Sequence, residues 1–135
     1  GDGGVMKAPA HGQTKSSDWT TMVFQARRPF DEAKIRALIA REYPGLLRVK
    51  GFFWVSSRPD DMGYLSVAGG VARWDFVGTW AAAMRERGGI SEAEIPESAK
   101  AYWEEPNGDR RQELAFIGLD VDMKTLRHDL EACLE

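Results

Sequence analysis

The sequence has little from which a metal site could be built. It holds one cysteine and two histidines among 135 residues. One cysteine cannot form an intramolecular disulfide, and structural zinc sites need about four thiolate or imidazole ligands. His11 lies far from His128 in the sequence, and Cys133 lies about 140° round a helix from His128. We therefore expect no metal-binding residue in this chain, and we interpret Cys133 as a core residue.

The sequence also lacks a long apolar run and an excess of basic residues. No stretch approaches the roughly 20 apolar residues of a membrane-spanning helix, and no charged-then-apolar leader opens the chain. Lysine and arginine number 18 against 21 aspartate and glutamate residues, for a net charge of -3. Proteins that coat nucleic acid or an anionic membrane need a basic excess. We expect a cytoplasmic protein without a membrane partner, and we do not expect nucleic acid as its main partner.

Motifs that carry common chemistries are missing as well. The sequence contains no GxxxxGK[ST] phosphate loop, no HExxH pair and no CxxC pair. Asp60-Asp61 and Glu104-Glu105 fit a turn and a solvated helix better than an acid and base pair, because no polarised pocket is predicted around them. The sequence therefore predicts no catalytic residue and no cofactor-binding residue.

The composition indicates one ordinary domain preceded by a tail. A chain of this length with 43% hydrophobic and 29% charged residues can bury a single core. Residues 1–18 are small and polar without periodicity, and we interpret them as a tag remnant and a flexible linker. The folded domain is expected over 19–135.

Alternating and helical periodicities predict the order βαβββ, insert, βα. Asp31 and Asp122 are expected to cap the two helices, the first ending at Pro44-Gly45. The expected strands are 20–26, 46–55, 63–68, 71–77 and one within 108–120, and the insert is 79–107. This order predicts an α+β fold, an antiparallel sheet of four to five strands with helices packed mainly on one face, as a ferredoxin-like variant.

Alternation assigns the residues of two strands to opposite faces of the sheet. The core side is expected to hold Leu47, Val49, Phe53, Val55, Leu114 and Phe116. The other side is expected to hold Arg48, Lys50, Phe52, Trp54, Arg111, Glu113, Ala115 and Ile117. Two interpretations of this second side stay open: the insert folds over it, with Glu104 and Glu105 meeting the arginines, or a partner docks on it.

An RNA-binding interpretation is an alternative. KGFFWV at 50–55 partly matches the signature in which a basic residue, a glycine and aromatic residues stack bases on a sheet. Phe53 stands where a small residue is expected, and Ser57 stands where an aromatic residue is expected. The net charge is also negative, so a small nucleic-acid-binding domain is the second hypothesis.

Four stretches in order raise a resemblance to a known family: ARRPFD at 26–31, GLLRVKGFFWVSSRPD at 45–60, AGG at 68–70 and GDRRQELAFIG at 108–118. Together they resemble the C-terminal domain of the CobW-like GTPases, which include metallochaperones, proteins linked to cobalamin synthesis and nitrile hydratase activators. The phosphate loop and the Cys-x-Cys-Cys motif of that family's GTPase domain are missing here. The chain thus resembles the accessory domain without the catalytic one.

The resemblance implies a parent protein that uses GTP and magnesium to deliver a divalent metal such as zinc or cobalt to a metalloprotein client. This chain would then contact the N-terminal GTPase domain of the same protein, the client or itself. The residues expected on the partner surface are Arg27, Arg28, Arg48, Lys50, Trp54, Arg110, Arg111 and Glu113.

Overall fold

The sheet of the protein has five antiparallel strands in the order β1-β5-β2-β3-β4. It is seen in a computed structural model that describes residues 17–135, and the predicted linker with His11 lies outside these residues except for Ser17 and Asp18. The strands are β1 (Trp19–Ala26), β2 (Leu46–Phe53), β3 (Asp61–Ala68), β4 (Val71–Thr79) and β5 (Gln112–Leu119). The helices are α1 (Glu32–Ala40), α2 (Ala81–Glu86), η1 (Glu92–Glu94), α3 (Glu97–Lys100) and α4 (Met123–Glu131).

The connection from β1 through α1 to β2 is a split βαβ unit. β5 pairs antiparallel with β1 on one side and with β2 on the other. The strands β1 and β2 therefore run parallel with β5 between them, and β2, β3 and β4 continue as a meander. The α+β class, the ferredoxin-like arrangement and the element order predicted from the sequence are confirmed.

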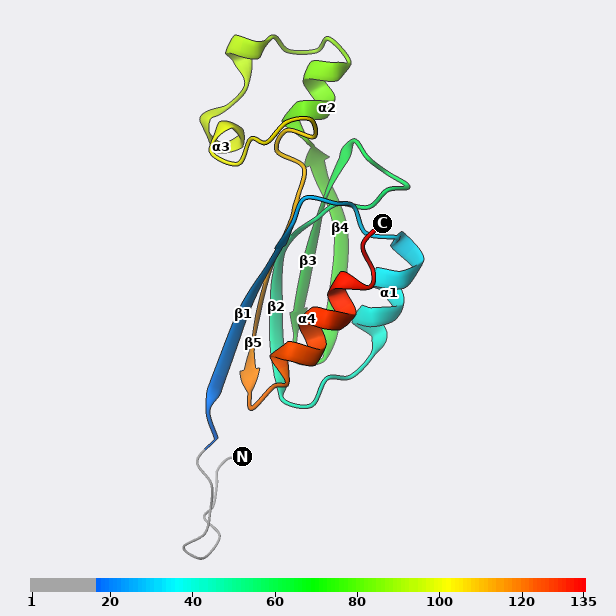
Figure 1. The fold of residues 1–135 in the computed structure, drawn as a ribbon, viewed down its shortest axis with the longest axis vertical. Helices are drawn as coiled ribbons and strands as arrows, with labels where there is room; N and C mark the ends of the chain where they lie inside the picture. Colours follow the sequence, from blue (N-terminus) through cyan, green and yellow to red (C-terminus); the bar gives the residue numbers. More distant parts are fainter. Residues whose placement is uncertain (1–16) are drawn as a thin grey trace, which may run out of the picture.

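The helices α1 and α4 cover one face of the sheet (Figure 1). Each begins where the sequence supplies a cap: Asp31 accepts a hydrogen bond from the Lys34 amide, and Asp122 accepts one from the Thr125 amide. Between helices and sheet lies one hydrophobic core. Its largest fully buried side chains include Phe24, Phe30, Phe53, Phe116, Leu126 and Leu130.

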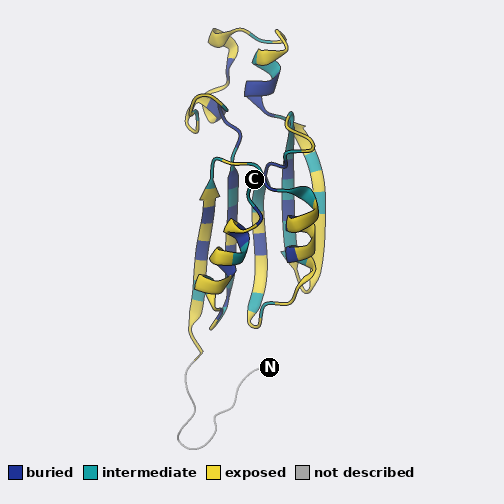
Figure 2. Ribbon diagram, turned by 45° about the vertical axis from the view of Figure 1, so that its right-hand side comes forward, coloured by how far each residue is buried: buried dark blue, intermediate teal, exposed yellow. Residues whose placement is uncertain are grey.

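The segment between β4 and β5 does not lie over the middle of the sheet. It projects past the ends of the strands, at the end of the molecule opposite to the entry of the chain (Figure 1). Buried residues continue into α2 and its neighbourhood (Figure 2). We call residues 80–110 the end module. It has an apolar cluster of its own around Ile95, and a second cluster joins Trp80 to Trp54, which follows β2, and to Phe52 and Met62 of the sheet.

Three details differ from the sequence-based expectations. Leu47 is 44% exposed, so its assignment to the core was wrong: the register between β2 and β5 shifts at Leu46/Arg48, which makes Leu47 an extra, bulged residue. The strand β2 ends at Phe53, because the backbone amide and carbonyl of the next residue, Trp54, form hydrogen bonds with the Gln112 side chain. The helix α1 ends at Ala40, so it does not reach Pro44-Gly45, where the sequence predicted its end. Among residues 17–135, no helix is long and apolar enough to cross a membrane.

Candidate interaction surface

The face of the sheet opposite to α1 and α4 is exposed over most of its area. Register aligns its residues in rows across the strands. Ala115 shows how open this face is, because it sits on an inner strand with strands on both sides and is still exposed. We call this surface the open face, and its rows contain Thr21, Ile117, Arg48 and Ala68; Val23, Ala115, Lys50, Ser66 and Arg73; and Gln25, Glu113, Phe52, Tyr64 and Asp75.

Over β1 and β5 the open face carries a group of apolar residues, with Thr21 among them and Gln25 and Glu113 towards the end module. Trp19 begins β1 with 64% of its surface exposed, and Val23 is 53% exposed. Because alternate residues of a strand share a face, Trp19 and Val23 lie on the side opposite to buried Met22 and Phe24. We call the group of Trp19, Val23, Ala115, Ile117 and Leu119 the apolar stripe. Sequence reasoning anticipated a basic and aromatic surface, and it did not anticipate this stripe.

Beside the apolar stripe, β2 gives the open face a basic border of Arg48 and Lys50, and Arg73 lies on β4, the far edge strand of the sheet. Arg48, Lys50 and Arg73 are exposed there. None of the three belongs to an ion pair within residues 17–135.

The end module is fastened to the sheet by the residues that precede β5. The Asp109 carboxylate accepts hydrogen bonds at 3.0 Å from the Ala81 and Ala82 amides, which caps the start of α2. The Arg110 guanidinium is 5% exposed, donates to both Glu86 carboxylate oxygens at 2.9 and 3.0 Å and donates to the Pro59 carbonyl at 2.7 Å. These bonds join α2 to the turn between β2 and β3.

Arg111 lies between the open face and the end module. Its guanidinium carbon is 3.8 Å from the centre of the Tyr102 ring and 6.0 Å from those of Phe52 and Trp80. It also donates to the Glu113 carboxylate at 2.7 Å and to the Asp109 carbonyl at 2.8 Å. The charged stretch before β5, which stood out in the sequence, therefore serves as the joint between two parts of the domain.

The eight residues predicted for a partner surface occupy three environments. Arg48, Lys50 and Glu113 belong to the open face, and Arg111 lies at its edge. Trp54 and Arg110 are buried at the end module. Arg27 donates to the Tyr102 and Gly108 carbonyls, and Arg28 donates to the Glu135 carbonyl. Glu104 lies 3.6 Å from Arg27, and Glu105 lies 3.6 Å from Arg85.

Gln112 is a structural residue that sequence reasoning missed. Its fully buried side chain accepts a hydrogen bond from the Trp54 amide at 2.9 Å and donates to the Trp54 and Arg28 carbonyls at 2.7 and 2.9 Å. One amide side chain thus satisfies three backbone groups where β1 and β2 end. The only signal in the sequence was a glutamine at a position whose alternation points to the core.

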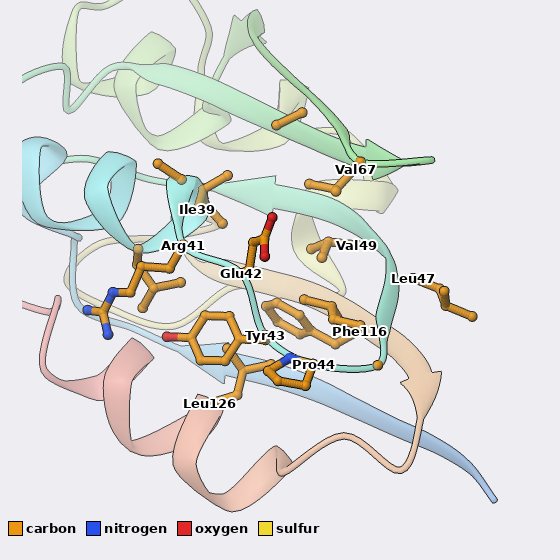
Figure 3. Close-up of a pocket in the computed structure, with 16 residues that line it drawn as sticks. Ile39, Arg41, Glu42, Tyr43, Pro44, Leu47, Val49, Val67, Phe116 and Leu126 are labelled. Carbon is orange, nitrogen blue, oxygen red and sulfur yellow. The ribbon is translucent and has the colours of Figure 1, made fainter. Parts of the chain in front are cut away.

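A cavity of about 600 Å³ lies on the helix-covered side, between the end of α1 and β2 and β3 (Figure 3). Its lining is mixed: Ile39, Val49, Val67 and Phe116 line it together with polar residues such as Arg41 and Glu42. At its edge the Tyr43 hydroxyl donates to the Asp129 carboxylate at 2.8 Å, and burial together with that carboxylate raises the pKa of Tyr43 to about 12. This tyrosine therefore stays protonated at neutral pH, and the cavity offers no general base at Tyr43.

The described part of the chain contains no group of three or more His, Cys, Asp or Glu side chains that could hold a metal ion. Cys133 is buried, and burial raises the pKa of its thiol. A raised pKa makes a thiol a poorer nucleophile and a poorer metal ligand at neutral pH. Cys133 is therefore a core residue, as the sequence predicted.

The joint between the end module and the sheet should weaken in acid. The hydrogen bonds from Arg110 hold the pKa of the Glu86 carboxyl below its ordinary value. A carboxyl whose pKa is depressed in the folded state contributes stability that is present above its unfolded pKa and is lost as pH falls through the folded one. Glu86→Gln should therefore melt below the wild type at pH 7, and the gap should begin to narrow near the ordinary pKa of a glutamate, about 4, and close at lower pH. Thermal melts from pH 7 to pH 2.5 test this, and an equal gap at every pH would contradict it.

Arg111 and Glu113 should differ in what they do for stability. Arg111→Ala removes the stacking on Tyr102, which should cost about 1 to 2 kcal/mol and speed proteolysis within 87–107, because cation–π contacts of partly desolvated arginines have that size. Glu113→Ala should cost about 0 to 1 kcal/mol. Denaturant melts and limited trypsin digestion of both variants measure this. Equal effects of the two substitutions would show that the Arg111–Glu113 pair, and not the stacking, holds the end module.

Comparison with known proteins places these features in one family. Residues 19–134 match the family model described as the cobalamin synthesis protein cobW C-terminal domain. The chain is 32% identical over 118 residues to the zinc-regulated GTPase metalloprotein activator 1 of Dictyostelium discoideum, a match over 84% of the chain and 25% of that protein. It is 31% identical over 112 residues to the zinc chaperone Rv0106 of Mycobacterium tuberculosis, over 82% of the chain and 28% of that protein.

The same fold occurs in a crystal structure of the Zn(II)-bound YjiA GTPase from E. coli. The superposition has a TM-score of 0.60 and covers 96% of this chain and 34% of that one, at 16% identity. The chain therefore spans about a quarter to a third of the length of the relatives that it matches.

Proposed function

We propose, from the premise that this chain belongs to the CobW C-terminal domain family, that it is the accessory interaction domain of a GTP-dependent metal chaperone. The observation that carries the proposal is the match of residues 19–134 to a C-terminal domain family, in relatives of which the chain covers only about a quarter and which are named as a zinc-regulated GTPase metalloprotein activator and a zinc chaperone. The GTPase chemistry and the metal belong to the rest of such a protein.

In this proposal the chain supplies contacts, and the parent protein supplies GTP hydrolysis with magnesium. The cargo would be a divalent metal, zinc or cobalt, delivered to a metalloprotein client in the cytoplasm. The described residues support this division of labour, because they offer an open face with exposed apolar and basic residues.

Deletion of this domain from the full-length protein tests the proposal. The remaining GTPase domain should still bind GTP, because the phosphate-binding loop lies outside this chain. Zinc transfer to an apo client should fall, because the client or the GTPase domain loses the accessory surface. The proposal fails if the full-length protein neither binds nor hydrolyses GTP, or if the deleted protein transfers zinc at the full rate.

A nucleic-acid-binding domain is the second candidate. It is supported by the position of Phe52 and Tyr64, whose rings lie 5.3 Å apart on the open face near Lys50. Against it stand the acidic net charge of the chain and the apolar stripe, which has no phosphate-binding groups. Binding to single-stranded RNA that survives physiological salt would favour this candidate.

A further inference from the structure

The apolar stripe is unusual for a solvated sheet face. Antiparallel sheets that face water on one side alternate apolar and polar residues, so that the wet face is polar. Single exposed apolar residues are common and need no explanation. In this face, however, Trp19 lies opposite Leu119, and Val23 lies opposite Ala115, so the apolar residues are contiguous across β1 and β5. A contiguous stripe of this kind is typical of a surface that another surface covers.

The stripe begins where the chain enters the domain. Asp18 is held against the end of β5, because its amide donates to the Asp120 carboxylate at 3.0 Å and its carbonyl accepts from the Asp120 amide at 2.9 Å. The next residue is Trp19, the first of the stripe. The start of β1 lies at the end of the sheet opposite to the end module (Figure 1), so an upstream domain would join the chain next to Trp19.

Tethering gives the upstream polypeptide an advantage over any free partner. A domain joined by a short linker has an effective concentration in the millimolar range at surfaces that the linker can reach. Matched relatives are three to four times as long as the aligned region, and this family is a C-terminal domain family. In a parent protein of that length, the remaining polypeptide would precede β1 and join the domain next to the stripe.

The charges beside the stripe describe what the partner surface should look like. Arg48 lies opposite Ile117 and Lys50 lies opposite Ala115, so both border the stripe along β2, and neither forms an ion pair among the described residues. Complementary interfaces place opposite charges at the rim of an apolar centre. The fitting surface is thus apolar in the middle with carboxylates along one side.

From these observations we propose that the open face is the docking surface for the upstream GTPase domain of the same polypeptide, with the apolar stripe at its centre and the basic border at its rim. The inference rests on the proposed function for the identity of the upstream domain. It deepens that function by naming the partner and the surface.

Cysteine footprinting of the full-length protein tests the inference. Val23→Cys and Ala115→Cys place thiols on exposed positions of the stripe, so both variants should fold, and Lys124→Cys on the exposed side of α4 is the matched control. Maleimide labelling, located by peptide mass spectrometry, is compared between the full-length protein and this chain. Positions 23 and 115 should label about tenfold more slowly in the full-length protein, because a covered thiol reacts only when the domains separate. Position 124 should label equally in both.

Three other outcomes of the labelling experiment would contradict the inference. Equal labelling of positions 23 and 115 in both proteins means that the upstream domain does not cover the stripe. Protection that disappears on dilution by about a hundredfold assigns the face to a second copy, since contacts in cis do not depend on concentration. Protection that needs added single-stranded RNA assigns it to nucleic acid.

Reversal of the basic border adds a second measurement. Arg48→Glu combined with Lys50→Glu should restore labelling at position 115 in the full-length protein, because carboxylates would then face carboxylates. Unchanged protection of position 115 would show that the basic border does not contribute to docking. GTP turnover is measured in the same samples: protection without turnover overturns the proposed function and leaves the docking surface, whereas turnover without protection overturns the docking surface alone.

Discussion

Phe116→Ala should destabilise the domain by about 3 to 5 kcal/mol, the usual cost of removing a fully buried phenylalanine ring. Phe116 is 2% exposed and lies on the inner strand β5, within the core beneath the helices. Domains of this size have a free energy of unfolding of about 5 to 15 kcal/mol, so the variant should be largely unfolded at 37 °C or close to it. Chemical denaturation followed by circular dichroism measures the loss.

The neighbouring residue supplies the control for this prediction. Ile117 is on the same strand but on the open face, and it is partly exposed. Ile117→Ala should cost clearly less than Phe116→Ala, because less apolar surface leaves contact with protein. Similar losses for the two variants would mean that the open face is packed as tightly as the core.

Gly51→Ala should be as damaging as the loss of a core ring, at about 3 to 5 kcal/mol. Gly51 has a φ of +147°, a region that residues with a side chain rarely adopt, and a methyl group there would overlap the Glu113 carbonyl. Backbone strain costs about 1 to 3 kcal/mol, and overpacking adds about 1 to 3 kcal/mol. The loss should arise from separation of β2 and β5, which hydrogen exchange of their amides would detect.

Gly78→Ala is the matched substitution in β4. A methyl group at Gly78 meets no atom within 4 Å, and this glycine has no positive φ. The melting midpoint of the Gly78→Ala variant should stay near that of the wild type. If Gly51→Ala also melts near the wild type, the close approach of β2 to β5 at this position is not as tight as described.

Gly51 also explains why KGFFWV resembles an RNA-binding signature. The glycine allows β2 to approach β5 closely. Phe53 is buried on the core side of the sheet, where Trp74 and Phe76 pack against its ring. Gly51 and Phe53, two residues of the KGFFWV motif, are thus explained by the fold without RNA. Phe52 is the aromatic residue of the motif that lies on the open face.

The strand and helix order could be predicted from the sequence because its periodicity is strong and both helix caps are local. The caps Asp31 and Asp122 act within three residues, so their neighbours suffice to identify them. The position of Leu47 could not be predicted, since a bulge reverses the alternation and depends on how β2 meets β5. The role of Gln112 depends on residues 58 and 84 positions away, which no local pattern carries.

The surface was predicted less completely than the fold for the same reason. Whether a charged residue faces a partner or the end module depends on where residues 80–110 lie. Their placement at the end of the sheet buries Arg110 and Trp54 but leaves Arg48 and Lys50 exposed. The apolar stripe combines strands from the two ends of the sequence, and each strand alone looks like an ordinary amphipathic strand.

Parallel calorimetric titrations of this chain and of the full-length protein with magnesium–GTP and with zinc test the central claim, that this domain supplies contacts and the chemistry lies elsewhere in the polypeptide. This chain should give no heat of GTP binding, because it has no loop of backbone amides with a lysine to hold a triphosphate. It should bind zinc no better than stray surface groups do, whereas the full-length protein should bind both. Micromolar GTP binding or a stoichiometric, submicromolar zinc site in this chain would contradict the account.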